Sequence, residues 1–145
     1  MPNWITNIST RSSISFTIPS SSNNFTGLNF CYVRAPLLVV QSSNFQHERL
    51  LYLPMIRISN ITKNRTWIYI HYVVGVNVGR DPVIFLSHWM FGLDEMEVGD
   101  HVTITIDEPT DVIKECGVRF MYDDGEDDAR LMLTYYNLTC QVSQS

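Results

Sequence analysis

Short runs of alternating apolar and polar residues fill most of the chain, and clusters of turn-forming residues separate them. In the first run Ile14, Phe16 and Ile18 recur at every second position. This period of two is typical of a β-strand that buries one face. Residues 25–33 are nearly all apolar, which favours a strand buried on both faces. The expected strands are Ser13–Ile18, Phe25–Val33, Leu50–Ser59, Thr66–Val74, Val83–Trp89, His101–Ile106, Glu115–Tyr122 and Arg130–Leu138.

The number of strands and the lack of a strong helical pattern set the expected fold class. Eight or nine short strands without a convincing amphipathic helix predict one all-β domain over residues 1–145, an antiparallel β-sandwich of jelly-roll or immunoglobulin-like type. Residues 91–98 are the one segment in which we expect a short helical turn. Pro54 places its strand toward a sheet edge, because proline cannot donate a backbone hydrogen bond. The expected core includes Ile14, Phe16, Ile18, Phe30, Val102, Ile104, Val118 and Phe120.

The composition excludes several classes of function. With 45% hydrophobic and 17% charged residues, the chain has the composition of a folded domain and not of a disordered one. The net charge of -5 argues against a nucleic-acid binder, which needs a cationic face. No run approaches the roughly 18 apolar residues of a membrane span, and the first residues lack the pattern of a signal peptide. We therefore expect no nucleic acid and no membrane among the partners.

The charges are unevenly divided along the chain. Residues 1–80 carry a balance of +6, and residues 81–145 carry a balance of -11. If the two halves lay on different faces, the domain would have a dipole able to steer a charged partner. We favour the simpler expectation that strands from both halves interleave, so that the charges largely neutralise one another.

Cysteines and N-x-S/T sequons favour different cellular compartments. Three cysteines are an odd number, and two of them lie in apolar runs, where a free thiol behaves as a small buried hydrophobe. Secreted domains usually pair their cysteines, so the sequence predicts reduced thiols at Cys31, Cys116 and Cys140 and a cytosolic protein. The sequons favour an extracellular protein instead, although Asn, Ser and Thr also serve turns. The sequons begin at Asn7, Asn24, Asn60, Asn64 and Asn137.

No arrangement of residues indicates catalysis, a metal or a cofactor. The four histidines lack the spacing of zinc ligands, and no glycine-rich phosphate-binding loop is present. Ser87 and His88 are neighbours in a strand, so their side chains point to opposite faces and do not suit a nucleophile–base pair. The acidic run 123–128 lacks the spacing of a calcium loop. A solvated hairpin turn explains it, with a cation or a basic partner as the alternative.

Aromatic and charged residues outside the core are the candidates for partner contact. Trp67 and Tyr69 share one face of a strand, opposite Ile68 and Ile70. If the isoleucine face is buried, the aromatic face is exposed and can anchor a protein or a sugar; the alternative is that both faces are covered. Loops are the other expected contact sites, at 42–49, 60–66 and 123–128, because they vary without disturbing a core. The candidate residues are Arg49, Lys63, Arg65, Trp67, Tyr69, Asp123, Asp124, Glu126, Asp127 and Asp128.

Several segments resemble one plant protein family. Residues 1–5 (Met-Pro-Asn-Trp-Ile) and 12–19 (Ser-Ser-Ile-Ser-Phe-Thr-Ile-Pro) are similar to its opening Pro-x-Trp-Phe and Ser-Ser-Val-x-Ile-x-Leu-Pro. Residues 27–33 (Gly-Leu-Asn-Phe-Cys-Tyr-Val) resemble its Gly-Phe-Ala-Leu-Cys-x-Val strand, and residues 112–122 contain its Cys-Gly-Val-Arg. The family is the C-terminal jelly-roll/Ig-like domain, also called the post-LRR domain, of plant TIR-type nucleotide-binding leucine-rich-repeat immune receptors.

The resemblance implies a β-sandwich that follows the leucine-rich repeats of a larger receptor and helps to recognise a pathogen effector. The implied partners are the effector protein and the receptor's own repeats, in the cytoplasm or nucleus, with oligomerisation only through the parent receptor. The family's NADase chemistry belongs to the TIR domain and its nucleotide switch to another domain, so no enzyme activity and no cofactor are implied for this chain. The alternative function is a carbohydrate-binding, lectin-like module, which the aromatic residues and the sequons favour.

Overall fold

The computed structural model describes residues 1–36, 50–52, 54–70, 73–75, 82–109 and 111–123. Within these residues the regular secondary structure is entirely β, as the sequence predicts. The expected strand at 130–138 lies outside the described residues. The strands are β1 (Asn7–Ser9), β2 (Ser13–Thr17), β3 (Phe25–Arg34), β4 (Leu50–Tyr52), β5 (Met55–Asn60), β6 (Arg65–Ile70), β7 (Val73–Gly75), β8 (Val83–Met90), β9 (His101–Ile106) and β10 (Ile113–Tyr122).

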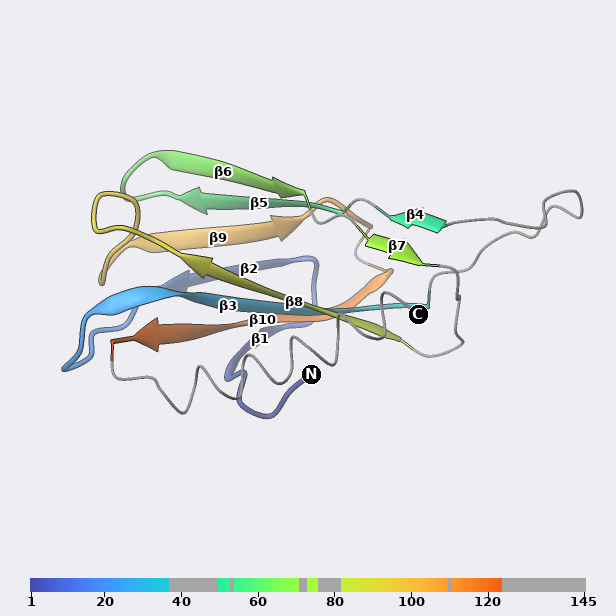
Figure 1. Cartoon of the computed structure of the whole chain (residues 1–145), viewed down its shortest axis with the longest axis horizontal. Helices are drawn as coiled ribbons and strands as arrows, with labels where there is room; N and C mark the ends of the chain where they lie inside the picture. Colours follow the sequence, from blue (N-terminus) through green and yellow to red (C-terminus); the bar gives the residue numbers. More distant parts are fainter. Residues whose placement is uncertain (37–49, 53, 71–72, 76–81, 110, 124–145) are drawn as a thin grey trace, which may run out of the picture.

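The strands pair as one long nested hairpin that has been rolled up. β1 pairs with β10, β2 with β9, β3 with β8, β4 with β7 and β5 with β6, all antiparallel. Rolling adds the cross-pairs β3–β10 and β5–β9, which complete two four-stranded sheets in the orders β1-β10-β3-β8 and β2-β9-β5-β6. Two antiparallel sheets of four strands with this connectivity form a jelly roll. Figure 1 shows the two sheets lying face to face, with β4 and β7 extending beyond one end.

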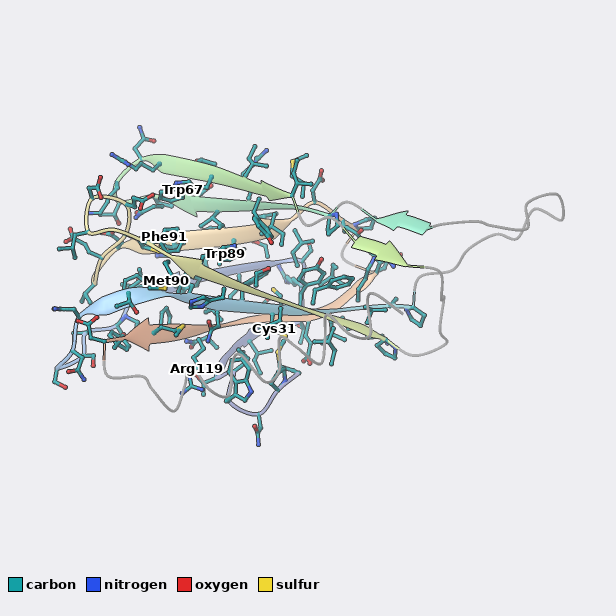
Figure 2. All side chains as sticks on the ribbon, in the orientation of Figure 1. Cys31, Trp67, Trp89, Met90, Phe91 and Arg119 are labelled. Atoms are coloured by element: carbon teal, nitrogen blue, oxygen red, sulfur yellow. The ribbon has the colours of Figure 1, made fainter. Side chains whose placement is uncertain are left out.

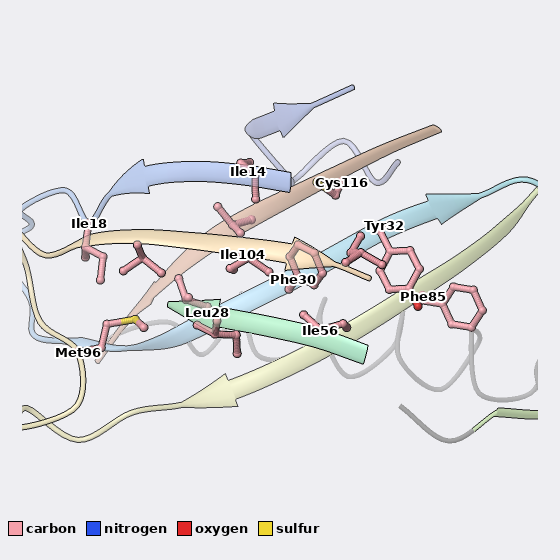
Figure 3. Packing of buried hydrophobic residues seen from close by; sticks show 14 of the residues in the cluster. Ile14, Ile18, Leu28, Phe30, Tyr32, Ile56, Phe85, Met96, Ile104 and Cys116 are labelled. Carbon is pink, nitrogen blue, oxygen red and sulfur yellow. The ribbon is translucent and has the colours of Figure 1, made fainter. Parts of the chain in front are cut away.

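The hydrophobic core lies between the two sheets (Figure 3). Most of the side chains that the sequence predicts to be buried are buried there. Phe16 and Phe120 are half-buried at its margin and meet edge to face, with ring centroids 5.2 Å apart. The expected core residues that are buried are Ile14, Ile18, Phe30, Val102, Ile104 and Val118.

The outer face of the β2-β9-β5-β6 sheet carries rows of hydroxyl groups. Ser15 and Thr103 face each other across β2 and β9 with their oxygens 2.9 Å apart, and Ser13 and Thr105 do so at 3.2 Å. These residues alternate with the buried isoleucines of the same strands. Period-two alternation therefore assigns the inner and outer faces of these two strands correctly.

Strands from the two halves of the sequence interleave, as expected. β3 comes from the basic half and lies between β8 and β10, which come from the acidic half. The pairing brings opposite charges together at the end of β3, where the Arg34 guanidinium donates to Glu108 at 2.9 Å. A simple division of the domain into a positive and a negative face is therefore wrong for the described strands.

One local expectation is wrong and another is confirmed. Residues 50–59 form two strands with Pro54 between them, and β5 lies in the interior of its sheet, not at an edge. Pro54 stands just before β5, where its missing N–H removes no hydrogen bond from the β5–β6 or β5–β9 pairing. Residues 91–98 contain the expected short helical turn, in which Glu95 and Met96 both donate to the Gly92 carbonyl at 3.0 Å, Met96 with the i to i+4 spacing of an α-helix.

Candidate functional site

The five described contact candidates lie in different environments. Lys63 and Arg65 lie at the β5–β6 turn, Trp67 and Tyr69 lie on β6, and Asp123 follows β10. Of these, Arg65, Tyr69 and Asp123 are exposed, and Asp123 donates its N–H to the Asn24 carbonyl at 3.0 Å. The remaining candidates, Arg49, Asp124, Glu126, Asp127 and Asp128, lie outside the described residues.

Lys63 serves the fold and is not free for a partner. Its ammonium group lies 2.6 Å from the Glu97 carboxylate and 3.5 Å from that of Asp100. The hydrogen bond that the Lys63 ammonium donates to Glu97 raises the pKa of Lys63 above its usual value. Buried Asn60 completes the cluster by donating to Asp100 at 2.8 Å and to the Glu95 carbonyl at 3.0 Å. The sequon at Asn60 is therefore a structural position, since its amide nitrogen is buried and engaged.

β6 turns its aromatic face toward the core and its isoleucine face toward solvent. This is the opposite of the arrangement considered from the sequence. Trp67 pairs with Ile58, and Tyr69 pairs with Ile56, whose side chains belong to the core. Trp67 is packed against that core, whereas Ile68 and Ile70 point outward and are each 57% exposed. A period-two pattern identifies two faces but does not say which one is buried when both are apolar.

An open groove lies between β6 and β8, which are the last strands of their respective sheets. Its volume is about 350 Å³. Rings from the two sheets meet across it: Trp67 lies 5.5 Å from Phe91 and Tyr69 lies 5.7 Å from Trp89, measured between ring centroids. Figure 2 shows Trp67, Phe91, Trp89 and Met90 along this gap. The lining residues are Ile58, Trp67, Ile68, Tyr69, His88, Trp89, Met90, Phe91 and Glu95.

The strands and the turn that border this groove carry exposed apolar side chains. Met90 is 62% exposed and Leu93, in the turn that follows β8, is 71% exposed. Together with Ile68 and Ile70 they bring four large exposed apolar side chains to strands β6 and β8 and the turn after β8. We call β6, β8 and the turn 91–98 the open edge. Concentrated exposed apolar surface is characteristic of an interaction site.

Few polar groups reach the groove. His88 donates a 2.7 Å hydrogen bond from its Nδ1 to the Asn29 Oδ1, and burial lowers the pKa of its imidazole. Glu95 accepts an N–H from Gly92 at 2.9 Å through its Oε1. The indole N–H of Trp89 is buried and has no hydrogen-bond partner in the part of the chain that the structure describes. The groove is therefore mainly aromatic, with one carboxylate at its wall.

The site offers no arrangement for hydrolysis or metal binding among the described residues. Ser87 is buried and pairs with Phe30, whereas His88 is exposed on the opposite face of β8, so the two cannot act as nucleophile and base. The described residues contain no group of three or more His, Cys, Asp or Glu side chains that could hold a metal ion. They also contain no helix long and apolar enough to cross a membrane.

Three of the segments that carry the family resemblance, 1–5, 27–33 and 112–122, meet elsewhere, on the outer face of the β1-β10-β3-β8 sheet. Ile5 packs there with Cys31, and the Arg119 guanidinium lies 5.6 Å from the centre of the Trp4 ring. A Cβ on Gly117 would lie 2.5 Å from Ile5 Cγ2, so only glycine allows this close approach. We call these five residues the N-terminal cluster. Figure 2 shows Arg119 beyond β10, away from the labelled groove residues.

The described cysteines are reduced and closed to solvent. Cys31 and Cys116 are free and buried, and burial raises the pKa of each thiol from 9.0 to about 12. Cys116 also donates to the Arg11 carbonyl at 3.3 Å. These two thiols agree with the prediction of reduced cysteines, and Cys140 lies outside the described residues.

Comparison with protein-family models, with curated proteins and with solved structures finds no match to this chain. The open edge was missed from the sequence because residues 71–82 separate β6 from β8 in the chain and neither strand carries a motif. The signal that could have pointed to it is the concentration of Trp67, Tyr69, Trp89 and Phe91 in strands β6 and β8 and the residue that follows β8.

Proposed function

We propose that this chain is the non-catalytic recognition domain of a plant intracellular immune receptor, and that it contributes to binding a pathogen effector and to activating the receptor. Two observations support the proposal: the segment resemblance to post-LRR domains and a jelly-roll sandwich of the kind that the resemblance implies. The receptor's leucine-rich repeats are the second partner. The domain acts in the cytoplasm or nucleus, without a cofactor of its own.

The open edge is the observation that carries the recognition role. Most strands direct their apolar residues into the core, whereas β6 and β8 leave Ile68, Ile70 and Met90 in solvent beside an aromatic groove. Aromatic residues and methionine are enriched in the contacts of protein–protein interfaces. The contact surface thus comprises the edge strands and the turn 91–98, and it replaces the 60–66 turn, whose lysine is held by Glu97 and Asp100.

The proposal is tested in the full receptor, expressed in leaf cells together with the effector that activates it. Replacing Ile68 and Met90 together by serine removes exposed apolar area and should reduce the cell-death response at an unchanged receptor level. The matched control replaces Ser15 and Thr103 by alanine on the hydroxyl-bearing face of the same domain. A full response from the edge variant, or equal losses from both variants, would refute a recognition role for the open edge.

Carbohydrate binding is the second candidate, and the aromatic groove is the observation in its favour. Indole and phenol rings such as those of Trp67 and Tyr69 can stack on sugar rings as well as contact proteins. A glycan array separates the two functions. Saturable binding of a defined glycan that is lost in Trp67→Leu would support the lectin-like alternative, and its absence would leave protein recognition as the better proposal. A purified chain that cleaves NAD would contradict both.

A further inference from the structure

The groove of the open edge combines aromatic faces with one carboxylate. Trp67 packs on Phe91 at an inclination of 54°, and Tyr69 packs on Trp89 at 74°, so the two contacting ring pairs form an aromatic wall along the groove. Glu95 is the one carboxylate among the described lining residues. Apolar ligands would need only the rings, whereas the combination of ring faces and a carboxylate suits a cation that carries an apolar stem.

We propose that the groove binds the side chain of an arginine that the protein partner presents. This inference rests on the proposed recognition function and names the chemistry of the contact. Arginine fits better than lysine because its planar guanidinium stacks on aromatic rings, is weakly hydrated and can donate two parallel hydrogen bonds to a carboxylate. The molecule contains a related cation–π contact, since the Arg119 guanidinium lies over the Trp4 ring, 5.6 Å from its centre.

The carboxylate of Glu95 forms no ion pair with the described residues. One oxygen of Glu95 accepts the Gly92 N–H, and no ion pair joins its carboxylate to a cation among the described residues. Lys63 is the nearby lysine that could neutralise this region, but Glu97 and Asp100 hold it. A guanidinium entering the groove would therefore meet an uncompensated carboxylate in a partly desolvated place, where such a contact is stronger than on an open surface.

The size of the groove limits the occupant to a small group. Its volume of about 350 Å³ is at the lower end of ligand pockets. That space admits one side chain and leaves the surrounding apolar residues, Ile68, Met90 and Leu93, to contact the rest of the partner. An arginine at the centre with an apolar rim matches the arrangement in which a few anchors carry most of an interface's energy.

The test uses the complete chain and two blocked tripeptides, glycyl-arginyl-glycine and its citrulline counterpart, which is a neutral isostere. Binding is followed by the indole N–H signals of Trp67 and Trp89 in NMR titrations at low salt, with Trp4 as the internal reference. We expect the arginine peptide to bind at least about fivefold more tightly than the citrulline peptide, and the preference to fall as salt is added.

Glu95→Gln is the decisive variant, because glutamine keeps an acceptor for the Gly92 N–H and removes the charge. It should reduce the arginine preference to less than about twofold, whereas Asp94→Asn, the adjacent acid outside the lining, should leave it in place. Equal binding of both peptides, no binding of either, or equal effects of the two variants would overturn the arginine proposal. None of these results changes the receptor assay, so failure of the arginine contact and failure of the recognition function are distinguished.

Discussion

The N-terminal cluster and the open edge are two surfaces of one sandwich with opposite properties. In the N-terminal cluster, Ile5 and Cys31 are buried and Gly117 allows the first residues to pack directly on β10. At the open edge, Ile68 and Met90 remain in solvent beside a groove. The first residues of the chain therefore cover the apolar side chains of the N-terminal cluster. No described segment covers the exposed apolar side chains of the open edge.

This contrast indicates that residues belonging to a recognisable motif need not lie at the proposed contact surface. Gly117 and Arg119 belong to the Cys-Gly-Val-Arg segment, and each contacts the beginning of the chain. Their identities follow from packing: a close backbone approach in one case and a ring contact in the other. The open edge has no motif, which suits the proposed recognition role of this surface.

Thiol reactivity gives the largest expected difference between the two surfaces. In a Cys116→Ala, Cys140→Ser background, Cys31 should react with a thiol reagent at pH 8 at least about a thousandfold more slowly than a cysteine placed at the open edge by Met90→Cys. Burial raises the pKa of Cys31 from 9.0 to about 12, so the reactive thiolate is scarce and also inaccessible. The rates are measured by mass spectrometry, and similar rates would show that the N-terminal cluster opens readily.

The raised pKa of the buried thiols should also make the free energy of unfolding depend on pH. The fold favours the neutral thiol, so this contribution is complete below pH 9.0 and is lost as the pH rises from there toward about 12. The free energy of unfolding should therefore fall over this alkaline range, and replacing both Cys31 and Cys116 by alanine should flatten the fall. Denaturant titrations at several pH values check the slope. An equal slope in the double variant would assign the alkaline loss to other groups.

Removing a buried apolar side chain from the N-terminal cluster should destabilise the domain strongly. Ile5→Ala removes packing against Cys31 and Leu86, and we expect a loss of about 2–5 kcal/mol in the free energy of unfolding. Ile8 is a matched control on the same segment, because its side chain is 48% exposed, and Ile8→Ala should change the stability by less than about 1 kcal/mol. Chemical denaturation measures both. Equal effects would contradict the closed state of this surface.

Adding one methyl group should change the stability differently at the two surfaces. The difference should be smaller than the one expected from Ile5→Ala. In Gly117→Ala the new Cβ would lie 2.8 Å from the Asn7 carbonyl oxygen, which is backbone and cannot easily move, so we expect a loss of about 1–3 kcal/mol. In Gly92→Ala at the open edge, the nearest atom is the Asp94 carboxylate oxygen at 2.9 Å, on a side chain that can rotate away. That variant should be nearly neutral, and thermal unfolding of the pair provides the comparison.

Changes at the exposed face of β6 should have the smallest effect on stability. Ile68→Thr keeps a β-branched residue in a strand and alters a side chain that is mostly in solvent, so the free energy of unfolding should change by no more than about 0.5 kcal/mol. The same change should weaken partner binding if the open edge is an interface. A large loss of stability would mean that Ile68 is structural, and the surface would then need another interpretation.

Much of the fold was predictable because period-two alternation reports which residues share a face. Ile14, Ile104 and Val118 are buried, and the polar residues between them lie outside. β1 escaped prediction because three residues, two of them polar, carry too little pattern to identify a strand. Prediction failed for β6 because both of its faces are apolar, so local sequence could not tell which one the partner strand would bury.

Local alternation of apolar and polar residues was enough to locate most strand-forming segments and most of the core. The meeting of Trp67 and Phe91, far apart in the chain, beside a groove while Ile68 stays in solvent follows from the tertiary arrangement. The physical reason is the rolling of the nested hairpin. Local residues specify each strand and its period, but the cross-pairs β3–β10 and β5–β9 determine which strands become edges, and therefore which side chains are left for a partner.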